Sequence, residues 1–219
     1  MNKLILTLLL LFGLTQAYAV DTLRQHSSEK QEETYWYAPI ISFFGQRVPE
    51  TKGRDLIIIN DDRSLIYNGQ RLRLMDSIDS WVKVIGVPSR ISKYGGYSWD
   101  DKGISISTKN KGIAKTINIQ FLSYREIFPE KTYNNFEGEG KGGVLISSFK
   151  GIIKIEDGYL AREINRDEFK KSDVWKKFKK RAFANSYSST YEDEVAIQFN
   201  VVTFTHDGQM KRVSMYSSL

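Results

Sequence analysis

Neighbouring carboxylates are the residues of this chain whose type and spacing best suit chemistry. Two carboxylates held close together can act as general acid and base on a glycoside. Each group lies where a strand is expected to end, and Asp and Asn commonly form turns at such positions. We therefore expect turns, and we keep a hydrolase that uses these pairs as the third of three hypotheses. The groups are Asp61–Asp62, Asp100–Asp101, Glu156–Asp157 and Glu192–Asp193–Glu194.

Histidine and cysteine offer little further chemistry. The sequence has no cysteine and two histidines, His26 in a polar stretch and His206 in a Thr-His-Asp-Gly turn. No Gly-x-Ser-x-Gly nucleophile elbow accompanies His206, and no His/Cys cluster suits zinc. The turn at Asp61 lacks the alternating ligands and the glycine of a calcium loop. We expect no catalytic residue, no metal site and no cofactor, and hence a protein that is not an enzyme.

Two groups of residues are candidates for binding a partner. Trp99 lies beside Asp100 and Asp101, and an exposed aromatic ring next to carboxylates makes a good interface anchor. A tryptophan buried next to a turn is the alternative. The second group is a basic segment whose positive face would attract an acidic partner or anionic lipid, with a solvated helix face as the alternative. Its candidate residues are Lys176, Lys177, Lys179, Lys180 and Arg181.

The first nineteen residues have the features of a secretory signal peptide. Lys3 precedes an apolar run from Leu4 to Leu14, and Ala17-Tyr18-Ala19 supplies an A-x-A cleavage site. The run is short for a membrane-spanning helix. We therefore expect cleavage after Ala19 and no transmembrane segment in the mature chain. Without cysteine there is neither a disulfide nor a lipid-bearing thiol, which favours a periplasmic or secreted bacterial protein.

The elements that position Trp99 are expected to be a hairpin, a helix and antiparallel strands. Asn68-Gly69 is a strong hairpin signal, because both central positions of such a turn need φ > 0. The apolar residues between Ile78 and Ile85 share one helical face, which Gly86 and Pro88 terminate. The stretch from Ile113 to Phe121 alternates apolar and polar residues, as a half-buried strand does.

The second half of the chain repeats this plan. A capping box at Asn165 predicts a helix, and Asp79–Lys83 aligns with Asp173–Lys177. The apolar face of this helix is expected to hold Val174, Trp175, Phe178 and Ala182. The sequence thus predicts an α+β protein of two related units, each a short helix packed on an antiparallel sheet. The expected divisions are a signal peptide (1–19), an N-terminal arm with an aromatic lead-in (20–54), a first α+β unit (55–128), a loop or linker (129–143) and a second α+β unit (144–219).

Two motifs resemble known families. The helix that ends in Gly86-Val87-Pro88 resembles the small outer-membrane assembly lipoprotein E family and the tandem-repeat domain of secreted β-lactamase inhibitor proteins, although the second unit lacks Gly-x-Pro. Tyr67-Asn68-Gly69, with the stretch from Tyr97 to Ile104 (YSWDDKGI), resembles a family of uncharacterised exported bacterial domains over roughly Ile57 to Leu122. These resemblances imply a module that works by protein–protein contact, and they imply no residue-level site.

The leading hypothesis for function is an exported, non-enzymatic binding protein. It would be an immunity- or inhibitor-type protein that blocks another protein by surface contact. The alternative is an envelope assembly or structural protein that touches anionic lipid or outer-membrane machinery. Nucleic acid is not an expected partner despite the formal net charge of +6, because an exported bacterial protein seldom meets it. A hydrophobic content of 41% is typical of a globular chain.

Overall fold

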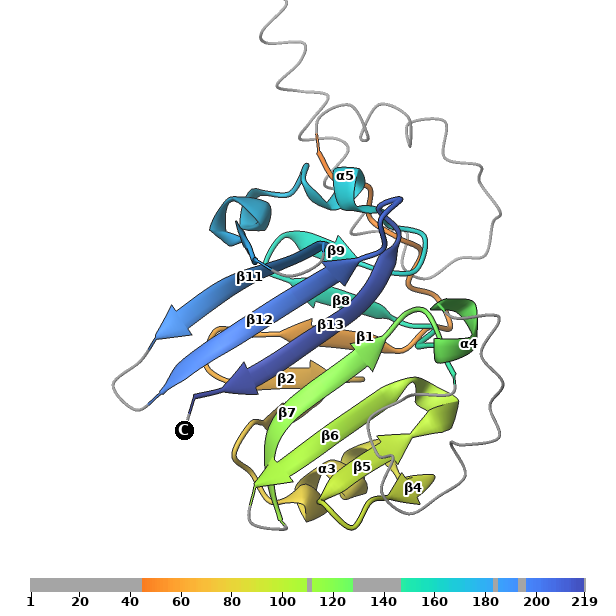
Figure 1. Cartoon of the computed structure of the whole chain (residues 1–219), viewed down its shortest axis with the longest axis vertical. Helices are drawn as coiled ribbons and strands as arrows, with labels where there is room; N and C mark the ends of the chain where they lie inside the picture. The colour runs from red at the N-terminus through yellow and green to blue at the C-terminus, as the bar shows by residue number, and fades with distance from the viewer. Residues whose placement is uncertain (1–44, 110–111, 128–146, 183–184, 193–195, 219) are drawn as a thin grey trace, which may run out of the picture. The chain divides into compact units, whose positions relative to one another are not determined.

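A computed structural model of the chain describes residues 45–109, 112–127, 147–182, 185–192 and 196–218. The expected signal peptide with its cleavage site at Ala19, the arm up to residue 44 and the linker 129–143 lie outside the described residues. The described part is mostly β and contains one sheet of five strands and one of eight (Figure 1).

The smaller sheet joins a three-stranded antiparallel meander to a hairpin through a parallel pair of strands. Strand β1 runs parallel to β8, with Ile57 opposite Ile153. The turn between β2 and β3 contains Asn68 at φ 46° and Gly69 at φ 85°, so the hairpin prediction is confirmed. In spatial order the strands are β3 (Gln70–Arg73), β2 (Ser64–Tyr67), β1 (Leu56–Ile59), β8 (Ile152–Ile155) and β9 (Gly158–Leu160).

The larger sheet is antiparallel, and it combines strands from both halves of the chain. Its centre is the pairing of β13 with β7, in which Val213 lies opposite Ile119. In spatial order the strands are β10 (Lys179–Lys180), β11 (Asn185–Glu192), β12 (Ile197–Phe204), β13 (Met210–Ser217), β7 (Ile113–Gln120), β6 (Ile104–Lys109), β5 (Gly96–Trp99) and β4 (Arg90–Ile91).

Helix α3 (Ile78–Ile85) forms where the sequence predicts it. The Ser77 hydroxyl accepts the N–H of Asp79 at 3.2 Å at its start, and Gly86 ends it with φ 101°. Ile78, Trp81 and Ile85 are buried, as their spacing predicts. The other helical segments are η1 (Asp100–Lys102), α4 (Tyr124–Ile127), α5 (Arg166–Phe169) and η2 (Asp173–Lys177).

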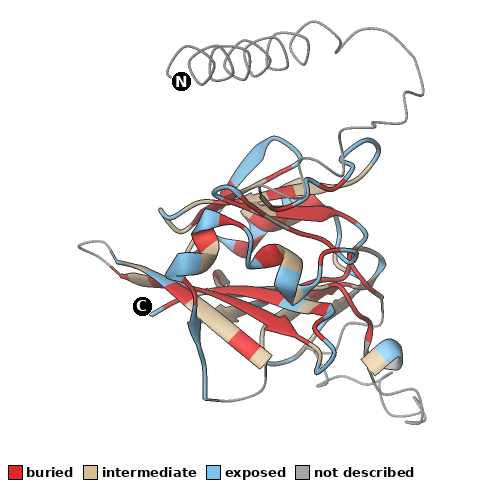
Figure 2. Cartoon of the chain, turned by 90° about the horizontal axis from the view of Figure 1, so that it is seen from above, coloured by how far each residue is buried: buried red, intermediate tan, exposed pale blue. Residues whose placement is uncertain are grey.

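Both sheets contribute to one hydrophobic core. Fully buried side chains include Ile57 and Ile153 from the smaller sheet and Ile117 and Met215 from the larger one. In Figure 2 many residues of the strands are coloured as buried, whereas exposed residues are frequent in the connecting turns and loops. This continuous burial supplies most of the stabilisation, because each buried aliphatic side chain contributes about 1.5–3 kcal/mol.

The expectation of two related α+β units is wrong. Strand β8 of the second half pairs with β1, and β13 pairs with β7, so each sheet draws strands from both halves. The acidic turns Asp61–Asp62 and Glu156–Asp157 follow β1 and β8, respectively. Strands β1 and β8 are parallel neighbours in one sheet, and the chain reverses direction after each of them. The boundaries expected from the sequence remain predictions.

The prediction of a single second helix, capped at Asn165 and with Val174 to Ala182 on its apolar face, is also wrong. Asn165 does cap a helix, accepting the N–H of Glu168 at 2.8 Å, but α5 has only four residues. The Asp157 carboxylate accepts the N–H groups of Asp173 and Val174 at 2.6 and 2.9 Å, and this bonding starts a separate turn. The apolar residues that mimic a helical face instead form an aromatic cluster of Phe169, Trp175 and Phe178, whereas Ala182 is exposed.

Candidate functional site

Trp99 is part of the core and does not form an interface anchor. It ends β5 with no exposed surface, and its indole Nε1 donates to the carbonyl of Gly86 at 2.7 Å. This bond links β5 to the C-terminus of α3. Trp99 therefore anchors the loop after α3. Of the two interpretations of this tryptophan, the structure supports the buried one.

The carboxylates that follow Trp99 have different roles. Asp100 binds the guanidinium of Arg90 through two hydrogen bonds, from Nε at 2.6 Å and Nη2 at 2.7 Å, and both side chains are partly buried. The bond to Asp100 raises the pKa of Arg90. Asp101 is exposed, with its carboxylate 3.7 Å from the ammonium of Lys102. Because Asp100 is engaged by Arg90, the geometry does not favour joint acid–base chemistry by the two carboxylates.

A shallow polar cavity of about 250 Å³ lies beside Asp101. Arg54 donates to the carbonyls of Lys150 and Gly151 at 2.9 and 3.1 Å and pairs with Glu163. A second charged group, Asp55, accepts the hydroxyl of buried Tyr67 at 2.7 Å. These charges stabilise the fold around the cavity. The lining residues are Gly53, Arg54, Asp55, Asp101, Lys102, Phe149, Lys150 and Gly151.

The basic segment is divided between two elements and the residue that follows them, and part of its charge is neutralised. Lys176 lies 2.6 Å from Asp173, and Lys177 lies 2.7 Å from Glu156, both at exposed positions. Lys179 and Lys180 are exposed on β10, the edge strand of the larger sheet. Arg181 follows them and donates to the hydroxyl of Tyr216 at 3.4 Å. The five candidate residues therefore do not form one helical face.

A set of exposed apolar side chains lies at the opposite edge of the larger sheet. Four large apolar side chains of the described residues are exposed, and three of them fall between positions 87 and 94. They are Val87 at 86%, Ile91 at 60% and Tyr94 at 75%. We call these three residues the β4 surface, because Ile91 lies in β4 and the other two flank it (Figure 1).

The β4 surface is held in a fixed shape. Arg90 of β4 is bound by Asp100, and the hydroxyl of Ser89 accepts the N–H of Asp100 at 3.1 Å. The turn after β4 closes through the N–H of Ser92, which donates to the Gly96 carbonyl at 2.7 Å. Lys93 places its ammonium 5.2 Å from the centre of the Tyr94 ring. A surface ordered before contact loses less conformational entropy on binding.

The other three sheet edges are protected. Edge strand β10 carries two exposed lysines, and edge strand β3 carries exposed Arg71 and Arg73. Strand β9 is covered by Gln46, whose side-chain amide accepts the N–H of Tyr159 at 2.8 Å and donates to its carbonyl. Charges on an edge, or a group that pairs with its backbone, prevent addition of a foreign strand. Among the described edge strands, β4 alone has large exposed apolar side chains in it or next to it.

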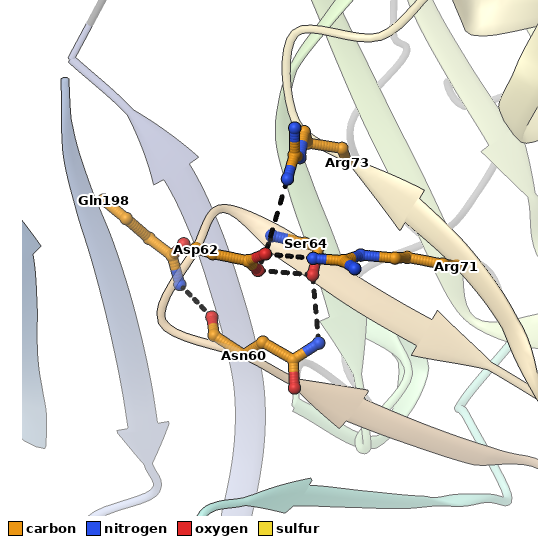
Figure 3. A network of polar contacts seen from close by, with 6 residues as sticks. All are labelled: Asn60, Asp62, Ser64, Arg71, Arg73 and Gln198. Carbon is orange, nitrogen blue, oxygen red and sulfur yellow. Dashed lines mark hydrogen bonds and ion pairs between the residues drawn. The ribbon is translucent and has the colours of Figure 1, made fainter. Parts of the chain in front are cut away.

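The acidic turn after β1 forms a polar network that reaches the other sheet (Figure 3). Asp62 binds Arg71 and Arg73 of β3 and accepts the Ser64 hydroxyl at 2.5 Å. Asn60 donates to Ser64 at 3.0 Å, and its carbonyl accepts Gln198 of β12 at 2.9 Å.

Glu156, in the turn after β8, is held in a similar way. It accepts the Tyr191 hydroxyl and pairs with Lys177. Burial opposes ionisation of both Asp62 and Glu156, but their hydrogen bonds and cationic neighbours leave each pKa below its ordinary value. The carboxylates of Asp62 and Glu156 are thus ionised groups that stabilise the two acidic turns.

The remaining sequence-based candidates contribute no site in the described part of the chain. His206 is exposed in the turn between β12 and β13, and His26 lies outside the described residues. The described residues contain no group of three or more His, Cys, Asp or Glu side chains arranged to hold a metal ion. Within the same residues, no helix has the length and apolar character needed to cross a bilayer.

Comparison with known proteins assigns a family. Residues 56–171, just over half of the chain, match the family described as Domain of unknown function (DUF7738). The chain belongs to this family. No curated protein and no solved structure matches it.

Membership confirms the resemblance to an uncharacterised domain family, and it provides no link to outer-membrane assembly lipoproteins or β-lactamase inhibitors. The DUF7738 match begins at β1 and includes Trp99, the Arg90–Asp100 pair and the whole β4 surface.

Sequence reasoning missed the β4 surface as a candidate. It treated Val87 only as part of the Gly86-Val87-Pro88 segment that ends a helix. Val87, Ile91 and Tyr94 are spaced by four and three residues, a spacing that also fits one apolar face of a helix. The sequence pattern therefore gave no signal that these three side chains are exposed.

Proposed function

We propose that this DUF7738 protein is a non-enzymatic binding protein that contacts another protein through its β4 surface. The observation that carries the proposal is the exposure of Ile91 in edge strand β4 and of Val87 and Tyr94, which flank that strand in the sequence. Covering such side chains contributes about 1.5–3 kcal/mol each. Aromatic anchors such as Tyr94 are common at the centres of protein interfaces.

The order of the β4 surface supports a role in contact. Arg90, Asp100 and Trp99 fix the backbone beneath it, as the hydrogen bonds of 2.6, 2.7 and 2.7 Å describe. An apolar patch that resulted from weak packing would not need such support. The partner that fits this surface is a protein with apolar side chains facing the β4 edge and backbone groups able to meet the strand.

Export is part of the same proposal. The basic start, apolar run and A-x-A motif of residues 1–19 suggest cleavage after Ala19 and action in the bacterial periplasm or outside the cell. In that setting an immunity- or inhibitor-type role is the form of binding we favour. Intact-mass analysis of the protein from its native host should give a chain that begins at Val20. Retention of Met1 or its neighbours would contradict export by cleavage.

The envelope alternative receives less support from the geometry. It relies on the basic segment, but Lys176 and Lys177 each lie beside a carboxylate. Lys179 and Lys180 remain as exposed cations on β10. Flotation with vesicles containing anionic lipid tests this alternative. Binding that depends on Lys179 and Lys180 would favour it, and its absence would remove the lipid version.

A comparative capture experiment tests the β4 surface. Purified wild-type protein and an Ile91→Lys/Tyr94→Lys variant are used as bait in extract of the native host, and bound proteins are quantified by mass spectrometry. The proposal predicts a specific protein retained by the wild type and lost at least tenfold by the variant. A matched Lys179→Ser/Lys180→Ser bait should retain it. Equal retention by all three baits would overturn the proposed surface.

A further inference from the structure

The inner face of β12 changes from apolar to polar along its length. Val202 and Phe204 face the core, and the two-residue alternation of a strand puts Asn200 and Gln198 on the same face. Both polar side chains have no exposed surface. Ser217 of β13, which lies directly opposite Gln198, is 1% exposed. Three polar side chains from adjacent strands therefore share the interior at this end of the sheet.

Some of their hydrogen bonds are made within the protein. The Nε2 of Gln198 donates to the carbonyl of Asn60 at 2.9 Å and to the Oδ1 of Asn200 at 3.0 Å. The first of these bonds crosses from β12 to the turn after β1, as Figure 3 shows. It sets the orientation of the Gln198 amide, because the carbonyl of Asn60 requires a donor.

Other polar atoms of the same cluster are left without partners. Within the described residues, no protein group bonds the Oε1 of Gln198, the Nδ2 of Asn200 or the Oγ of Ser217. The set comprises one acceptor, one amide donor and one hydroxyl that can do either. Buried polar groups in folded proteins nearly always have a partner, since burying them unpaired costs the full loss of hydration.

We propose that ordered water occupies this polar interior and bonds Gln198, Asn200 and Ser217. Water matches the set because it donates and accepts in equal number and carries no charge. Each of the three atoms is almost inaccessible from outside, which favours the smallest polar molecule over an organic ligand. Buried waters of this kind characteristically bridge two to four polar groups. The hydrated cluster would join the two sheets through the Gln198–Asn60 bond at an end where apolar packing stops.

Electron density gives the direct test. A crystal structure of the full chain at about 1.5 Å should show water within 2.7–3.2 Å of at least two of the three atoms. Empty space at all three would overturn the proposal. Density too large for water would overturn it in favour of a bound ligand.

A matched pair of variants gives an independent test in solution. Ser217→Ala removes a hydroxyl that bonds water if the site is hydrated, so its urea midpoint should fall. If the site is dry, the same change deletes an unpaired buried hydroxyl, and an unchanged or raised midpoint would contradict the proposal. Ser214→Ala is the control, because the Ser214 hydroxyl donates to Asn118 at 2.7 Å and its loss should lower the midpoint in either case.

Discussion

The two edge strands of the larger sheet are built in opposite ways. Strand β10 ends the sheet with Lys179 and Lys180, both exposed. Strand β4 ends it with Ile91, flanked by exposed Val87 and Tyr94. Lysine on an edge prevents association with another chain, whereas exposed apolar side chains gain free energy when a partner covers them. One edge is protected from contact and the other is suited to it.

Arg90 shows that the difference does not follow from charge composition alone. Strand β4 also carries a cation, but Asp100 holds it at 2.6 and 2.7 Å, with only 26% of the arginine side chain exposed. Its charge is used to fix the hairpin and does not protect the edge. Near the other edge, Lys176 and Asp173 bond each other while both remain in solvent. Whether a charged side chain fixes local structure or protects an edge therefore depends on how far it is buried.

The largest expected effect comes from removing the support beneath the β4 surface. Trp99→Ala should lower the free energy of unfolding by about 3–5 kcal/mol, because a fully buried ring leaves a cavity. Urea unfolding measures this loss. Tyr94→Ala is the control, and at an exposed site it should change stability by no more than about 0.5 kcal/mol. Equal losses of stability in the two variants would contradict the distinction between Trp99 as a buried support and Tyr94 as a surface residue.

The acidic pair gives the next largest effect. Asp100→Ala should cost about 1–3 kcal/mol of stability, because Arg90 loses both hydrogen bonds to Asp100 in a partly buried setting. It should also speed amide exchange at Ile91, measured by hydrogen exchange. Asp101→Ala, one residue along and exposed, should leave both measurements near wild type. A loss from Asp101→Ala as large as that from Asp100→Ala would contradict their different roles.

Exchanging the character of the edges should change association more than stability. Lys179→Ile/Lys180→Val gives β10 an apolar edge, so self-association should appear in size-exclusion chromatography with light scattering. Ile91→Lys should leave the protein at the wild-type mass or reduce any association already present. Stability should shift by about 0.5 kcal/mol or less in both. An unchanged mass for the β10 variant would show that its lysines do not protect that edge.

The smallest effect concerns pH at the protected edge formed by β3. The pKa of Asp62 lies below its ordinary value of 3.8, because Ser64, Arg71 and Arg73 outweigh the effect of burial. The folded protein therefore binds fewer protons here than the unfolded chain, and the stability gained above pH 3.8 is lost as pH falls through the lowered pKa. Asp62→Asn should thus lower the urea midpoint slightly at pH 7 and progressively less below pH 4. A difference that is independent of pH would contradict this role.

Local signals in the sequence predicted local structure well. Asn68-Gly69 predicts the β2–β3 turn, and the spacing from Ile78 to Ile85 with Gly86 predicts α3, because both depend on neighbouring residues. The partners of each strand depend on residues far apart, such as Ile57 and Ile153. No local pattern determines such pairings, so the two related units were inferred in place of two mixed sheets.

Polar strands and compact turns account for the remaining errors. Strand β11 reads NSYSSTYE, and its serines and tyrosines gave no apolar alternation. The segment from Val174 to Phe178 has helical spacing, but Asp157 binds the N–H groups at its start and Phe169 gathers its rings. Prediction of the candidate site from the sequence was limited in the same way. Trp99 was recognised as important, but its burial, and the exposure of Tyr94 in its place, depend on tertiary packing.

Site-specific cross-linking in the native host can show whether a partner protein binds at the β4 surface. A photoreactive phenylalanine analogue replaces Tyr94 in one strain and Lys180 in another, and cross-linked products are resolved by mass. We expect a discrete adduct with one protein from position 94, lost when Ile91→Lys is added, and none from position 180. An adduct from position 180 alone, or the same products from both positions, would contradict the assignment of the β4 surface as the site of contact.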